Sequence, residues 1–408
     1  MRATGRLRGP YTSRVETEEL NRLIRSLNAA GAGERLELVR GDEPGTGSPA
    51  APAAPGPVEL PPPLVALLAE TVRRGATDLL LVPGAPPSVR LHGRLEPLPG
   101  EPLGPDAVRD LVRPTLSAAR RQRVEAAGSA DLSLRVAALG RFRMNVHRTQ
   151  GGEAAAIRVL PKRIPTLAEL GLPASLHDLT RSARGLVLVT GATGSGKTTT
   201  LAALLDRVVG EEKLHVVTIE DPVEYEHRHR KSVVEQVEVG ADAPDFATAL
   251  VAALRQDPDV LLVGEMRDEA TARTVLTAAE TGHLVLTTVH TNDAPQSVHR
   301  VLDLFPPGQQ TQVRQQLSLC LSAIVCQQLV PRKDGGGRAA AVEILVATDA
   351  IRAHIRKGQL HHLHNEMTLG RRFGMVTMEE SLAALVRDGA IAETEARLRA
   401  SHPEDLRV

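Results

Sequence analysis

The second half of the chain repeats one pattern, a short apolar run followed by a segment with helical periodicity. The apolar runs that predict buried strands span 185–190, 214–219, 259–263 and 284–289. Strands and helices that alternate predict a mostly parallel sheet wrapped by helices. Three more helices are expected in the tail, over 349–356, 378–387 and 393–399. Residues 167–408 are therefore expected to form one α/β domain.

A smaller α/β domain with its own sheet is expected over residues 64–160. Its predicted helices span 64–74 and 105–125, and its predicted strands span 77–82, 131–136, 141–148 and 154–160. Residues 83–87, with four prolines or glycines in five positions, predict a turn. Pro161 and Pro165 mark 161–166 as the hinge to the larger domain.

The first 63 residues have a different character. Ser13 and Glu16 have capping-box spacing, and an apolar face follows, which predicts an amphipathic helix over 13–28. A strand is predicted over 35–39. Residues 41–63 are rich in Pro, Gly and Ala and predict a flexible linker. Residues 1–40 are too few for a large core, so they are expected to dock on a partner or to be partly disordered.

Composition narrows the functional classes. The 408 residues are 42% hydrophobic but only 1% aromatic, with 49 basic and 49 acidic side chains. A neutral chain with few aromatic rings argues against a nucleic-acid partner. No secretory signal and no apolar run of about 18 residues is present, so a cytoplasmic chain is expected, with membrane association only through partners.

The two cysteines match no zinc or disulfide pattern. Cys320 and Cys326 lie in the apolar run 317–330, which predicts a single helix. They are interpreted as buried structural thiols.

The segment 191–198 reads Gly-Ala-Thr-Gly-Ser-Gly-Lys-Thr and fits the phosphate-loop pattern G-x-x-x-x-G-K-[ST], between an expected strand and an expected helix. Glycines let loop amides and the helix N-terminus approach a polyphosphate closely. Lys197 is expected to reach the β- and γ-phosphates of a nucleoside triphosphate, and Thr198 to supply a hydroxyl to Mg²⁺. The expected nucleotide-binding residues are Gly191, Thr193, Gly194, Ser195, Gly196, Lys197, Thr198 and Thr199.

Two acidic sites follow predicted strands. Glu265 ends the run that begins at Asp259, so it is expected at the carboxyl edge of the sheet, where it would polarise the attacking water with help from Mg²⁺. Pro222 is expected to force a turn that exposes Glu220, Asp221 and Glu224. Such carboxylates, Asp221 among them, suit Mg²⁺ and its water shell.

Histidines flank another predicted strand. His283 precedes the strand 284–289 and His290 follows it. Either one could sense the γ-phosphate through a hydrogen bond, but lone histidines are usually structural, and their spacing leaves both interpretations open. The histidines at 354, 361, 362 and 364 have no carboxylate or cysteine set with them in the sequence. They are interpreted as a polar surface.

These segments, in this order, make the chain resemble the type II/IV secretion ATPases, whose Walker A, Asp box, Walker B and His box are matched by 191–198, 220–226, 259–265 and 282–291. Within that family it is most similar to the type IV pilus retraction ATPases (PilT). The stretches that carry this second resemblance are 141–146, 263–268, 276–284, 350–357 and 373–378.

The resemblance implies a RecA-like P-loop core joined to a PAS-like N-terminal domain, in a ring-shaped homohexamer that hydrolyses ATP with Mg²⁺ between the two domains. The implied partners are an inner-membrane pilus platform protein and, indirectly, pilin. Residues 350–356 match a segment tied to retraction. The implied site residues are Glu265 as catalytic glutamate, Glu220 and Glu224 as Asp-box acids, His283 and His290 as the His-box pair, and Arg143 and Arg158 as nucleotide contacts.

Two features depart from this family. Leu80 stands where the family often has a histidine, in an S-D-[IL]-H signature, and the extension 1–63 is unusual. A PilU-like accessory ATPase, a pilus extension or type II secretion ATPase, a non-hydrolysing regulator and a nucleic-acid translocase remain alternatives. Most extension and secretion ATPases carry a four-cysteine zinc module, whereas this chain has no C-x-x-C.

Overall fold

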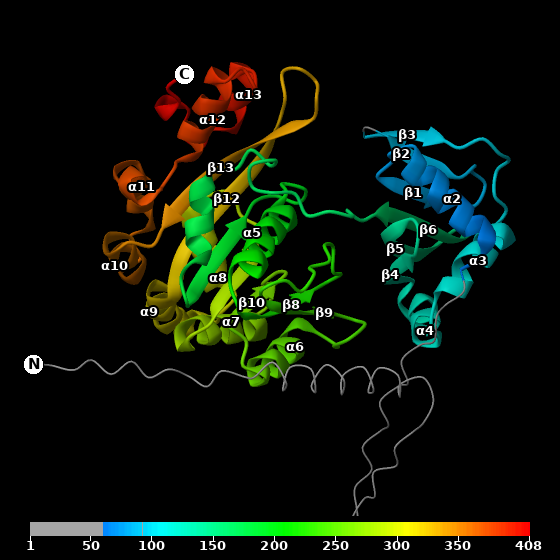
Figure 1. Ribbon diagram of the computed structural model, residues 1–408, viewed down its shortest axis with the longest axis horizontal. Coiled ribbons are helices and arrows are strands. Elements are labelled where there is room, and N and C mark those ends of the chain that lie inside the picture. The colour runs from blue at the N-terminus through cyan, green and yellow to red at the C-terminus, as the bar shows by residue number, and fades with distance from the viewer. Residues whose placement is uncertain (1–59, 92) are drawn as a thin grey trace, which may run out of the picture. The chain divides into compact units, whose positions relative to one another are not determined.

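The computed structural model describes residues 60–91 and 93–408, which contain a six-stranded and a seven-stranded sheet (Figure 1). The predictions for 13–28 and 35–39, and most of the predicted linker, lie outside these residues. None of the helices in the described ranges is long and apolar enough to cross a membrane.

The six-stranded sheet is formed by residues 78–159 and is antiparallel throughout, in the order β3-β2-β1-β6-β5-β4. Its strands are β1 (Asp78–Leu81), β2 (Ser88–Leu91), β3 (Arg94–Pro97), β4 (Ser129–Val136), β5 (Gly140–Thr149) and β6 (Gly152–Val159). Its helices are α2 (Pro62–Arg73), α3 (Pro105–Val112) and α4 (Ala118–Ala127). The sequence pattern did not predict β2 and β3.

Alternation along the strands gives this sheet one apolar and one polar face. Phe142, Met144 and Val146 of β5 are buried in a core with α2 and α3, whereas Arg141 and Arg143, which alternate with them along the strand, point to the other face. The polar face therefore carries the arginines.

The predicted helix over 105–125 is wrong as a single element. The structure divides it into α3, a 3₁₀ turn over Arg113–Thr115, and α4. Pro114 has no backbone N–H to donate, so the α-helical hydrogen-bond pattern cannot continue through it. Ser117 then starts α4 anew, because its hydroxyl accepts a hydrogen bond from the Arg120 amide.

The seven-stranded sheet has the order β13-β12-β7-β11-β10-β8-β9, and only β13 is antiparallel to its neighbour. Its strands are β7 (Gly185–Thr190), β8 (His215–Glu220), β9 (Val233–Glu238), β10 (Val260–Val263), β11 (Leu284–Val289), β12 (Leu321–Pro331) and β13 (Arg338–Val346). The four strands predicted from apolar runs are confirmed as β7, β8, β10 and β11.

Helices cover both faces of this sheet (Figure 1). Successive residues of β7 show the division, since Val187 and Val189 pack in a core with α5, whereas Leu186 and Leu188 pack in the core that holds the other helices. These helices are α5 (Lys197–Glu211) on one side, and α6 (Phe246–Ala253), α7 (Glu269–Thr281), α8 (Ala294–Asp303) and α9 (Gln310–Cys320) on the other. Burial on both faces explains why the strands are continuous apolar runs.

The predicted single helix over 317–330 is also wrong, because α9 ends at Cys320 and β12 begins at Leu321. Strand β12 lies between β7 and β13, so it is as continuously apolar as a buried helix, and periodicity does not separate the two. Cys320 and Cys326 are buried free thiols, as expected. Burial raises the pKa of Cys320 to about 12.

Short helices complete the chain after β13. They are α10 (Asp349–Lys357), α11 (Leu363–Leu369), α12 (Met378–Arg387) and α13 (Glu393–Arg399), which confirms the three predicted tail helices. Helices α12 and α13 pack on the β12–β13 hairpin through a core of their own that includes Val330, Ala341 and Leu382.

Candidate active site

The glycine loop joins the end of β7 to the start of α5. Gly191, Gly194 and Gly196 have φ of 141°, 78° and 90°, values that side chains rarely allow. A Cβ on Gly191 would lie 2.3 Å from the carbonyl oxygen of Gln327. At position 191, glycine is therefore required both by the backbone conformation and by the lack of space for a side chain.

Lys197 is the first residue of α5, and its side chain turns back into the loop. It is 8% exposed, and its Nζ donates to the carbonyl oxygens of Gly191 at 2.8 Å and Ala192 at 3.0 Å. Burial lowers the pKa of Lys197, while the nearby Glu265 carboxylate opposes that shift. The ammonium group is thus held inside the loop by weak neutral acceptors.

Ser195 and the two threonines after Lys197 complete the loop. The Ser195 hydroxyl is buried without a hydrogen-bond partner among the described residues. Such an orphan is unusual and fits a loop built to surround a polar ligand. Thr198 is half-buried at the start of α5, and the Thr199 hydroxyl lies 2.9 Å from the Tyr225 hydroxyl.

Glu265 lies at the same edge of the sheet. It follows β10, and its side chain is 15% exposed. Its carboxylate lies 2.6 Å from Arg267 Nε and 3.5 Å from His290 Nε2, while His290 Nδ1 lies 3.4 Å from Lys197 Nζ. The structure thereby brings Lys197, His290 and Glu265 together and adds Arg267, which the sequence did not indicate.

The two flanking histidines lie at opposite ends of β11. His290 follows Val289, which pairs with Thr190 at the loop edge, whereas His283 precedes Leu284, which pairs with Gly185 at the amino edge. His283 Nδ1 lies 3.0 Å from the carbonyl oxygen of Ala278 near the end of α7. Within one chain, His283 therefore lies at the edge of the sheet opposite to the glycine loop.

The acidic turn after β8 differs from the prediction at Glu220. This carboxylate is only 7% exposed, and it accepts hydrogen bonds from Thr218 Oγ1 at 2.7 Å and Gln236 Nε2 at 3.2 Å. Burial raises its pKa. Asp221 is exposed and Glu224 half-buried. Glu220 faces inward because it is still part of β8, one residue before the turn.

Arg143 and Arg158 lie on the polar face of the N-terminal sheet, where they pair in register across β5 and β6. Arg143 Nε lies 3.7 Å from Asp131, and Arg158 Nε lies 2.9 Å from Asp78. The structure therefore pairs both arginines with carboxylates of the same six-stranded sheet.

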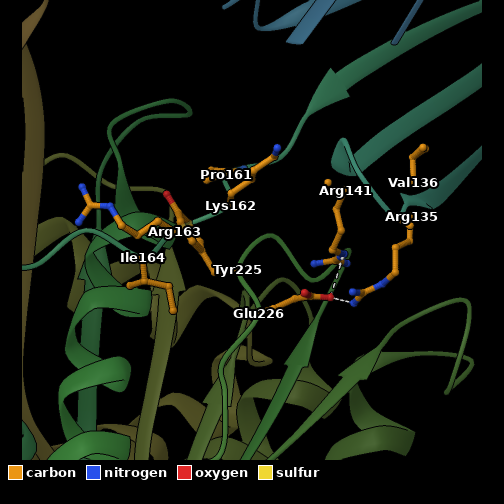
Figure 2. Close-up of a pocket in the computed structure, with 11 residues that line it drawn as sticks. Arg135, Val136, Arg141, Pro161, Lys162, Arg163, Ile164, Tyr225 and Glu226 are labelled. Carbon is orange, nitrogen blue, oxygen red and sulfur yellow. Dashed lines mark ion pairs between the residues drawn. The ribbon is translucent and has the colours of Figure 1, made fainter. Parts of the chain in front are cut away.

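A cavity of about 140 Å³ lies next to the acidic turn (Figure 2). Arg135 and Arg141 both form ion pairs with Glu226 in its wall, and Arg141 Nη2 also lies 3.6 Å from Glu238. Tyr225, which contacts Thr199, lines the same cavity. Sequence reasoning missed Tyr225 because an aromatic ring inside an acidic segment carries no motif of its own.

The histidines of the tail have carboxylate neighbours that the sequence did not indicate. His354 Nε2 lies 3.5 Å from Glu366, and His364 Nε2 lies 3.2 Å from Asp405. Among residues 60–91 and 93–408, no three His, Cys, Asp or Glu side chains are grouped so that they could hold a metal ion.

A family model described as "Type II/IV secretion system protein" matches residues 121–407. The chain belongs to this type II/IV secretion family. A family member from Pseudomonas aeruginosa, the "Type IV pilus retractation ATPase PilT", is 42% identical over 340 residues, which cover 83% of this chain and 98% of the relative. The "Type IV pilus ATPase PilU" of the same organism is 39% identical over 342 residues, 84% of this chain and 90% of the relative.

A solved structure of the family agrees in fold. It is described as the pilus retraction motor PilT with bound ADP, has 44% sequence identity and a TM-score of 0.78, and the match covers 84% of this chain and 98% of that one. The fold class is thus α/β with a RecA-like P-loop core, as expected for the secretion family.

Proposed function

We propose that this chain is a Mg²⁺-dependent ATPase that forms a homohexamer and drives retraction of a type IV pilus. The observation that carries the proposal is the contact series from Lys197 through His290 to Glu265, at the loop edge of the sheet. Identity of 42% to PilT along 98% of that relative supports the pilus assignment.

The loop residues would bind the triphosphate of ATP. Phosphate oxygens are stronger acceptors for an ammonium group than neutral carbonyls, so Lys197 Nζ would exchange Gly191 and Ala192 for the β- and γ-phosphates. The unpartnered Ser195 hydroxyl would gain an acceptor. Thr198 would hold Mg²⁺ together with phosphate oxygens and water, and Asp221 would face its water shell. Bound Mg²⁺ would supply positive charge that stabilises the phosphate oxygens.

Glu265 would orient the attacking water. Its Oε2 lies near His290, and its Oε1 is held by Arg267, so the carboxylate is fixed in position before substrate arrives. The water oxygen attacks the γ-phosphorus while the bond to the β-phosphate oxygen breaks, and Glu265 accepts the proton that the water loses. His290 contacts both the phosphate-binding lysine and this base, which suits it to report the γ-phosphate.

The remaining predicted residues have less direct roles in this proposal. Glu220 and Glu224 are the Asp-box acids of the family, and burial of Glu220 favours its neutral form. His283 would act at an interface between subunits, since it lies away from the loop of its own chain. Arg143 and Arg158 would leave their aspartates to contact a nucleotide. An inner-membrane platform protein, and through it pilin, would receive the motion.

A separate observation bears on each alternative function. PilU is 39% identical, so identity alone does not separate an accessory retraction ATPase from the main one. The absence of C-x-x-C counts against an extension or secretion ATPase. Intact Lys197, Thr198 and Glu265 count against a regulator without turnover.

The deciding experiment is cellular. The gene is deleted and then restored as wild type, as Lys197→Ala, as Glu265→Gln, or as the control Glu269→Gln, whose side chain pairs with Arg273 on α7. We expect non-retracting, hyperpiliated cells with the deletion and the two site variants, and normal retraction with the control. Cells without pili would indicate extension instead, and unchanged pili in the deletion strain would refute the pilus assignment.

A further inference from the structure

Gln327 is a buried polar residue outside the four family segments named above. It lies on β12, one position after Cys326, which pairs with Thr190 at the end of β7. Its side chain belongs to a residue only 4% exposed. Because the glycine loop starts at Gly191, directly after Thr190, Gln327 lies beside the place where the loop leaves the sheet.

Both ends of the Gln327 carboxamide are used. Its Nε2 donates to the carbonyl oxygen of Ser195 at 2.8 Å, and its Oε1 accepts from Thr200 Oγ1 at 2.6 Å. A carbonyl can only accept, so the amide nitrogen must be the end that faces Ser195. The side chain therefore joins the loop to the first turns of α5 in one fixed orientation.

The glycines of the loop make room for this contact. A Cβ on Gly196 would lie 2.8 Å from Gln327 Nε2, and one on Gly191 would lie 2.3 Å from the Gln327 carbonyl oxygen. Residue 327 thus fills the space beneath both ends of the loop. Glycine at these two positions fits the loop to β12 as well as to an anion.

We infer that Gln327 is a positioning residue that holds the glycine loop in its nucleotide-binding shape. In a planar trans peptide the C=O and the following N–H point in opposite directions. When Gln327 holds the Ser195 oxygen toward β12, the N–H of Gly196 must point away from β12, free to donate to a phosphate. This inference rests on the proposed ATP site.

The first test is Gln327→Leu in the full chain, measured by titration with ADP and Mg²⁺ and by steady-state ATPase assays. Leucine keeps the approximate volume but leaves the Ser195 carbonyl and the Thr200 hydroxyl without their partner. Two buried groups lose their hydrogen-bond partner at once, so we expect ADP affinity to fall about tenfold, which corresponds to about 1.4 kcal/mol. The KM for ATP should rise more than kcat falls, because the glycine loop contributes mainly to ATP binding, which precedes the hydrolysis step.

The second test, Gln327→Glu, gives a readout that loss of packing would not change. An ionised carboxylate cannot donate to the Ser195 carbonyl, whereas a protonated carboxyl group can. We expect the ADP affinity of this variant to approach that of the wild type as pH is lowered from 8 to 6, after division by the wild-type value at each pH. Thr200→Val, which removes only one of the two bonds, should cause a smaller loss.

The matched control is Gln328→Leu, which changes the next residue of β12, on the opposite face and half-buried. It should leave ADP affinity unchanged. Binding within twofold of wild type for Gln327→Leu, or a pH-independent defect for Gln327→Glu, would overturn the inference. If Gln327→Leu does not fold, Gln327→Glu and Thr200→Val decide. A wild-type chain that binds no ADP would instead refute the proposed function.

Discussion

Both edges of the seven-stranded sheet carry polar and charged side chains, but the hydrogen-bond partners of these side chains differ between the two edges. At the carboxyl edge, Lys197 is held by neutral carbonyls, and the Ser195 hydroxyl has no partner among the described residues. At the amino edge, His283 lies against a carbonyl of α7, and Asp259 Oδ2 accepts the backbone N–H of His215 at 2.8 Å.

The difference separates functional from structural polar groups. A side chain that completes a backbone hydrogen bond has its best partner already, so a ligand would gain little from it. A buried charge with weak acceptors, or a buried hydroxyl with none, can gain a stronger partner when a ligand arrives. On this basis we propose that the carboxyl edge is the functional one, and the following predictions test that division.

The largest effect is expected from Glu265→Gln at the carboxyl edge. The amide keeps the size of the side chain but cannot take a proton from water. We expect kcat for ATP hydrolysis to fall about 10²–10⁴-fold, with ADP affinity within a few-fold of wild type. Phosphate release and ADP titration measure the two quantities. Hydrolysis that survives the substitution would refute the role of Glu265.

The next largest effect concerns Glu343, buried on β13 beside Cys326 and thus at the level of the loop. Burial raises its pKa from 4.5 to about 7, although the Ala294 amide, which donates to its Oε1 at 2.8 Å, opposes the shift. Since the folded state holds the proton more tightly, its contribution to stability is complete below pH 4.5 and is lost as pH rises through about 7.

Glu343→Gln removes this dependence. At 1.36 kcal/mol per pKa unit, the wild type should lose roughly 3 kcal/mol between pH 4.5 and 7 relative to the variant. Urea unfolding of both proteins across that range measures the difference. Parallel curves would contradict the prediction.

The third prediction compares substitutions of the histidines at the two ends of β11. His290→Ala removes a contact to Lys197 and to Glu265, so ATPase activity should fall about tenfold, as for one lost hydrogen bond of about 1.4 kcal/mol. His283→Ala in the isolated chain should leave ADP affinity unchanged, since the imidazole ring lies against the Ala278 carbonyl of α7, away from the glycine loop. A loss of ADP affinity with His283→Ala, or unchanged ATPase activity with His290→Ala, would contradict the distinction between the edges.

The smallest effect is expected from Asp259→Ala at the amino edge. The carboxylate is exposed and accepts one backbone hydrogen bond, so its loss should lower the free energy of unfolding by about 1 kcal/mol without changing the KM for ATP. Asp259→Asn, which keeps an acceptor, should recover most of the stability.

The sequence predicted the parts of the core that burial determines. Strands β7 and β11 match their predicted bounds because residues buried on both faces form continuous apolar runs. The same property made β12 look like a continuation of α9. The length of the apolar run could not separate the strand from the helix. In addition, no proline or glycine marks the boundary at Cys320.

The candidate site was predictable where a motif fixes both chemistry and direction. Lys197 and Glu265 follow strands of a parallel sheet, so both had to reach its carboxyl edge. The same argument favours His290 over His283, but the two histidines look symmetric about β11 in the sequence. Gln327 was not predictable, because a glutamine in an apolar run reveals its partners only when the strand order is known.

The β12–β13 hairpin lies beside β7, the strand that leads into the glycine loop. Nine residue pairs, from Ala323–Val346 to Pro331–Arg338, join these strands, and α10 begins three residues after β13 ends. A hydrogen-bonded strand pair of this length is stiff. We therefore expect a displacement at the glycine loop to move the hairpin as one unit. The hairpin thereby forms a continuous hydrogen-bonded connection from the strand that carries the glycine loop to the start of α10.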